Sequence, residues 1–113
     1  MSMDLAVWSD GEILLQNVLP ESSAWVSYQE ELAYEKESWQ VLVMPGSETP
    51  EVEVLQKFPK ASKVYYVTLE PISAGPEGYE FLEKVIRSLA KSCGGVWVDP
   101  YGVAYFYNEG SFE

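Results

Sequence analysis

The clearest pattern in the chain lies in residues 76–93 and fixes one layer of the fold. Apolar side chains recur there every three or four residues, which places one stripe on a helix: Leu82, Val85, Ile86, Leu89 and Cys93. Charged side chains cover the opposite side, and Gly94 is suited to end the helix. The segment therefore predicts a long amphipathic helix, which needs another layer of structure to bury its stripe.

A hairpin is predicted directly after this helix. Residues 96–98 and 103–107 are rich in β-branched and aromatic side chains, and the sequence Asp99-Pro100-Tyr101-Gly102 between them is typical of a turn. Asp99 has two interpretations, a catalytic carboxylate at a strand end or a turn residue that binds the local backbone. We favour the turn residue.

The first 38 residues give a less regular pattern. Residues 5–8 predict a strand, Ser9-Asp10-Gly11 a hairpin turn, and residues 12–18 the returning strand. Residues 21–38 fit either a helix or a strand. We favour a helix, because Glu, Ala, Leu, Lys and Gln are frequent there.

The middle of the chain predicts two strands and a short helix. Residues 41–44 form an apolar run that is typical of a strand covered on both faces. A short helix is expected after Thr49, with Val52, Leu55 and Phe58 facing inward. Residues 63–69, rich in Val and Tyr, predict the next strand.

Together these elements predict a single α+β domain over residues 1–113. We expect a single-layer mixed or mainly antiparallel sheet of five to six strands, two main helices packed on it, and a C-terminal hairpin. Apolar residues make up 47% of the chain, which is enough for a core, and no apolar run approaches the length of a membrane span. The single cysteine, Cys93, excludes an internal disulfide, so we expect a cytoplasmic protein.

The absence of histidine excludes several kinds of site. Ser-His-Asp, Cys-His and histidine-containing zinc sites all require imidazole. Asp4, Asp10 and Glu12 do not have the spacing of an EF-hand loop. We therefore expect no enzyme activity, no catalytic residue, no cofactor and no metal.

Negative charge is concentrated in the first half of the chain. The whole chain has a net charge of −11; residues 1–56 have eleven acids and one base (net −10), and residues 57–113 have seven acids and six bases (net −1). Such a surface repels nucleic acid and anionic membranes and favours a basic protein partner. The alternative is a solvated surface that only maintains solubility. The expected partner-binding residues are Trp25, Glu30, Glu31, Glu35, Glu37 and Trp39.

Residues 79–100 carry a family resemblance. The run from Tyr79 to Lys91, followed by Gly94-Gly95-Val96-Trp97-Val98-Asp99-Pro100, resembles small bacterial α/β proteins in which a helix "LAxxxGG" leads into a strand ending in "DP". Several such proteins are immunity proteins of polymorphic toxin systems. The resemblance implies an inhibitor that binds a cognate toxin, and it carries over no catalytic residue.

Two other functions stay open at this point. Aromatic residues make up 14% of the chain, so a pocket lined by aromatic rings, tyrosine hydroxyls and carboxylates could bind a small molecule or act as an enzyme. A homodimer could form through an exposed edge of the C-terminal hairpin.

Overall fold

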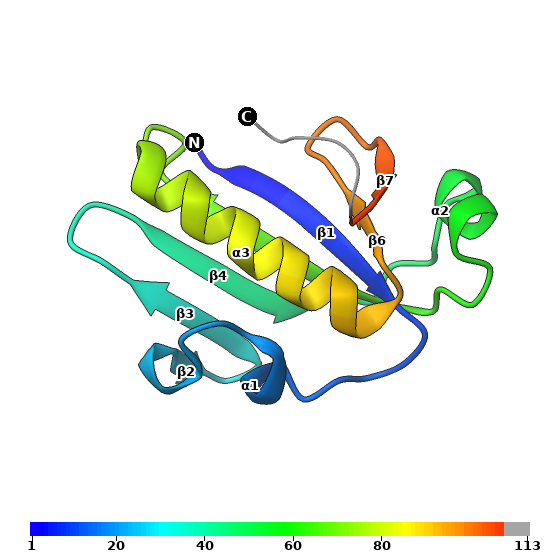
Figure 1. The fold of residues 1–113 in the computed structure, drawn as a ribbon, viewed down its shortest axis with the longest axis horizontal. Coiled ribbons are helices and arrows are strands. Elements are labelled where there is room, and N and C mark those ends of the chain that lie inside the picture. Colours follow the sequence, from blue (N-terminus) through cyan, green and yellow to red (C-terminus); the bar gives the residue numbers. More distant parts are fainter. Residues whose placement is uncertain (108–113) are drawn as a thin grey trace.

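The computed structural model describes residues 1–107 as an α+β fold built on one seven-stranded antiparallel sheet (Figure 1). The strand order is β2-β3-β4-β5-β1-β6-β7. The strands are β1 (Met3–Ser9), β2 (Val26–Tyr28), β3 (Glu31–Glu35), β4 (Gln40–Pro45), β5 (Lys63–Glu70), β6 (Val96–Val98) and β7 (Ala104–Phe106). The helices are α1 (Leu15–Val18), a 3₁₀ turn (Ser22–Ala24), α2 (Val52–Lys57) and α3 (Pro76–Cys93). The α+β class and the C-terminal hairpin are confirmed, with more strands and fewer long helices than expected.

Helix α3 is the main helix, and it lies diagonally across one face of the sheet (Figure 1). Four of the five residues of its predicted stripe are buried: Leu82, Val85 and Leu89 have no exposed surface, and Ile86 has almost none. Cys93, the last of the five, is half-buried. They pack against Val7, Val41, Val67 and other side chains that the central strands direct to the same side. The apolar side chains at every third or fourth residue of the helix and at every second residue of the strands thus pack in one core.

Strand β1 lies inside the sheet, which overturns the hairpin predicted at residues 9–18. Its two edges are occupied by β5 and β6, because Val7 pairs with Tyr65 on one side and with Trp97 on the other. No edge remains for a strand returning directly from Ser9. Residues 12–14 instead lead into the short helix α1, which occupies residues 15–18.

The helix expected over residues 21–38 is also wrong, because most of this segment forms the β2–β3 hairpin. Gln29 adopts a left-handed conformation in the turn, with φ of 59°, which lets Tyr28 pair with Glu31. Strand β3 then pairs with β4, and the two side chains that it directs to the core, Leu32 and Tyr34, are two residues apart, as in any strand. Pairing with β4 therefore outweighs the helical preference of the local composition.

Two smaller predictions in the middle of the chain are corrected. Strand β4 is covered on one face only: Val41 and Val43 are buried, whereas Met44 is exposed. In α2 the buried residue is Val54, and Val52 and Leu55 face solvent. The reason is that α2 covers only a corner of the sheet, where Val54 packs in a small second core with Trp8, Val64 and Val96.

Asp99 acts as the turn residue that the sequence favours. Its Oδ1 accepts hydrogen bonds from the backbone N–H groups of Tyr101 and Val103, both at 2.9 Å. Replacing Asp99 with alanine should lower the free energy of unfolding by about 1 kcal/mol, because both N–H groups lose their acceptor. Chemical denaturation measures this change, and Asp99→Asn, which keeps a side-chain oxygen, should cost less. Equal stability of the alanine variant and the native protein would contradict this role.

Candidate functional site

The face of the sheet opposite α3 is covered by the described helices only at the corner where α2 packs. We call it the open face. Side chains alternate along each strand, so Leu32 and Tyr34 point to α3 while Ala33 points away from it. Paired residues share a side, which extends the open face from Ala33 to Leu42, Thr68 and Asp4.

All charged residues that the strands direct to the open face are acidic. They are Asp4 of β1, Glu31 and Glu35 of β3, and Glu70 of β5. The strand lysine, Lys63, points to the other side, where its ammonium lies 6.0 Å from the Tyr65 ring centroid. Lys57 lies at the corner that α2 covers, with its ammonium over the Phe106 ring. Lys36 follows Glu35 at the end of β3, and its ammonium lies over the Tyr34 ring, which points to α3. The strands β1 to β5 therefore direct only negative charge to the open face.

Exposed apolar side chains lie among these carboxylates. Val26 and Tyr28 of β2 and Met44 of β4 are between 42% and 52% exposed, far more than the core residues of the same strands. Half-buried Leu42 and Tyr66 continue the apolar area toward the middle of the sheet. Apolar anchors surrounded by charge are the usual composition of a surface that binds another protein.

The exposed side of α3 differs from the open face in its charge balance. It carries Glu77, Glu80 and Glu83 together with Lys84, Arg87 and Lys91. Arg87 Nη2 lies 2.7 Å from Glu83 Oε1, and this is the one ion pair among residues 1–107. Three acids and three bases leave this side close to neutral, so it serves as a natural control surface for the open face.

The structure separates the four glutamates predicted to bind a partner. Glu31 and Glu35 lie on the open face, and the Tyr28 hydroxyl reaches Glu35 Oε1 at 3.4 Å. Glu30 lies in the β2–β3 turn, and Glu37 lies in the connection between β3 and β4; both are exposed. Glu30 and Glu37 therefore lie beyond opposite ends of β3, and the four glutamates do not form one cluster.

The two predicted tryptophans lie on the α3 side instead. Trp39 is 7% exposed, and it stacks with Tyr34 and packs near Phe81, so it is a core residue and not an accessible anchor. Trp25 is half-buried in the same aromatic cluster, and its indole N–H donates to the Pro20 carbonyl at 2.8 Å. Both face away from Glu31 and Glu35.

Sequence reasoning missed Tyr28, Met44, Asp4 and Glu70 as members of the same surface. Tyr28 and Met44 lay in segments predicted as a helix and as a strand covered on both faces. Asp4 and Glu70 lie far from Glu31 in the sequence, and pairing of β1 with β5 and of β5 with β4 brings them onto one face. Strict alternation in each strand was the signal for their orientation, but only the strand order places them together.

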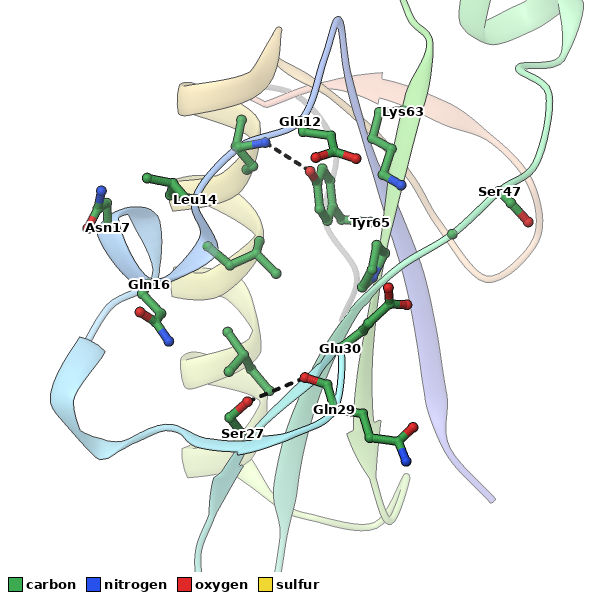
Figure 2. Close-up of a pocket in the computed structure, with 15 residues that line it drawn as sticks. Glu12, Leu14, Gln16, Asn17, Ser27, Gln29, Glu30, Ser47, Lys63 and Tyr65 are labelled. Atoms are coloured by element: carbon green, nitrogen blue, oxygen red, sulfur yellow. Dashed lines mark hydrogen bonds between the residues drawn. The ribbon is translucent and has the colours of Figure 1, made fainter.

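A second candidate site is a hollow at the end of the sheet, shown in Figure 2. We call it the end hollow; its volume is about 640 Å³, within the range of ligand sites. Its polar lining comes from four separate segments. They are the chain before and in α1 (Glu12, Gln16), the β2–β3 turn (Gln29, Glu30), the chain after β4 (Ser47) and β5 (Lys63, Tyr65). Leu14, Leu15 and Leu32 supply part of its apolar wall.

Tyr65 is the most buried polar residue of the end hollow. Its side chain is part of a residue only 3% exposed, and its hydroxyl oxygen accepts a hydrogen bond of 2.9 Å from the Ile13 N–H. Burial raises the pKa of Tyr65, and the nearby Cys93 and Glu12 raise it further, although the Ile13 hydrogen bond acts in the opposite direction. The hydroxyl therefore remains protonated at neutral pH.

Within residues 1–107, no group of three or more aspartate, glutamate or cysteine side chains is arranged to hold a metal ion. None of the helices in this part of the chain has the length and apolar character of a membrane span. Comparison with known proteins finds no matching family model, no matching curated protein and no matching solved structure.

Proposed function

We propose that this protein is an acidic protein-binding module that docks its open face onto a basic protein. The observation that carries the proposal is the coincidence on one face of carboxylates that form no ion pair within residues 1–107 and of exposed apolar side chains. The charged strand residues there are all acidic, and Tyr28 and Met44 lie among them. A solvated surface that only maintains solubility has no need of exposed apolar anchors.

The two kinds of side chain would have separate roles in binding. The carboxylates attract a basic partner over a distance of about a Debye length and align it during encounter. The apolar side chains then lose contact with water at the interface, which supplies much of the affinity. The complex should therefore form quickly and weaken as salt is added.

The acidic charge also restricts the kind of partner. Carboxylates on the open face repel the phosphates of nucleic acid, so a polyanion is not the expected ligand. A toxin or nuclease has a basic surface where it binds its own anionic substrate, and an acidic inhibitor complements such a surface. We accordingly propose an immunity or inhibitor role in the cytoplasm. The homodimer through the C-terminal hairpin stays a prediction.

The test is capture from native lysate with the full chain as bait, at low and at high salt. We expect one stoichiometric basic protein that high salt releases. A variant with Tyr28→Ser and Met44→Ser should capture much less of it, because both changes remove exposed apolar contacts without entering the core. Capture of the same protein in equal amount by this variant would contradict docking through the open face.

A further inference from the structure

The end hollow places three charged side chains, from separate segments, around one concave space. Figure 2 shows Glu12 and Lys63 on the same side of the Tyr65 ring, while Glu30 enters from the β2–β3 turn. None of these three forms an ion pair with another residue of the described chain 1–107. Two carboxylates and one ammonium therefore remain available to a ligand.

The Tyr65 hydroxyl adds a part-buried donor to this set. It accepts from the Ile13 N–H, and no residue among 1–107 accepts the hydroxyl's own proton. Tyr65 as a whole is only 3% exposed, and it lines the hollow. A hydroxyl proton at the wall of a hollow, with no acceptor from the described chain, favours a ligand that brings one, such as a carboxylate.

The complement of this charge set is a molecule with two positive groups and one negative group. We propose that the end hollow binds a free basic α-amino acid, of the arginine and lysine class, with its two cations toward Glu12 and Glu30 and its carboxylate toward Lys63 and the Tyr65 hydroxyl. The space of about 640 Å³ accommodates a molecule of this size. This site is separate from the open face, and it gives the small-molecule function a specific ligand class.

Other ligand classes match the hollow less well. A phosphate ester or other polyanion would be repelled by two carboxylates. A purely apolar ligand would leave the carboxylates, the ammonium and the Tyr65 proton without partners. A lysine side chain of a protein partner brings one cation and no carboxylate, so it would leave the Lys63 ammonium without a negatively charged partner.

Calorimetric titration of the full chain with L-arginine and L-lysine tests the proposal. Agmatine lacks the carboxylate, and L-norleucine lacks the side-chain cation, so each should bind at least about tenfold more weakly than the parent amino acids. Absence of heat with both L-arginine and L-lysine at millimolar concentration would overturn the proposal. Equal binding of L-norleucine would also overturn it.

Variants assign the groups within the hollow. Lys63→Met should weaken L-arginine about tenfold and leave agmatine unchanged, because only L-arginine has the carboxylate. Glu12→Gln and Glu30→Gln should weaken both ligands, and Glu83→Gln on α3 is the matched control with no expected effect. If Lys63→Met weakened both ligands equally, the proposed orientation would be wrong. Loss of capture by the Tyr28 and Met44 variant does not bear on this site, so the two proposals can fail separately.

Discussion

Replacing Leu82 with alanine should lower the free energy of unfolding by about 3 kcal/mol. Leu82 has no exposed surface and lies in the middle of the stripe that α3 presses against the sheet. The substitution removes buried methyl groups and leaves a cavity. The sheet cannot move to fill this cavity, because pairing with β5 and β6 fixes the position of β1 beneath the helix. Urea denaturation followed by circular dichroism measures the loss.

The matched control lies on the exposed side of the same helix. Arg87→Ala breaks the one ion pair of the described residues, but both partners are about half exposed, so the loss should stay below about 1 kcal/mol. A loss for Leu82→Ala no larger than that for Arg87→Ala would mean that α3 does not pack on the sheet as described.

Reversing Glu31 and Glu35 together, each to lysine, should slow association with the captured basic partner about tenfold at low salt. It should also speed dissociation, because both side chains lie on the open face and would contact the partner directly. Stopped-flow or surface-plasmon kinetics with the purified partner separate the two rates.

Glu77→Lys with Glu80→Lys is the control for this experiment. It makes the same change of net charge, but on the exposed side of α3 and away from the open face. It should slow association through the loss of long-range attraction and leave dissociation nearly unchanged. Faster dissociation for this pair, with no change for the Glu31 and Glu35 pair, would place the contact surface on the α3 side instead.

The sequence predicted those elements whose local pattern and tertiary role agree. Helix α3 has a long apolar stripe, and the turn at Asp99 has residues that bind the local backbone, so neither depends on distant partners for its identity. The β2–β3 hairpin was missed because its composition favours a helix, and only pairing with β4 decides otherwise. Residues 12–18 were misread because the sequence does not show that β5 and β6 occupy both edges of β1.

The sites depended even more on the strand order. The sequence showed that the first half is acidic, but not that Glu31 and Glu35 would join Asp4 and Glu70 on one face. Trp39 was predicted as an anchor because the sequence does not show that it stacks with Tyr34 in the core. The end hollow combines residues 12, 30 and 63, and no local motif links these positions.

Carboxyl footprinting of the free protein and of its complex with the captured partner tests docking through the open face most directly. A carbodiimide-coupled label, read by mass spectrometry, reports the accessibility of each acidic side chain without any substitution. The open-face account predicts reduced labelling of Asp4, Glu31, Glu35 and Glu70 in the complex, and unchanged labelling of Glu77, Glu80 and Glu83 on α3. Protection of the α3 glutamates, with the open-face carboxylates labelled as in the free protein, would contradict it.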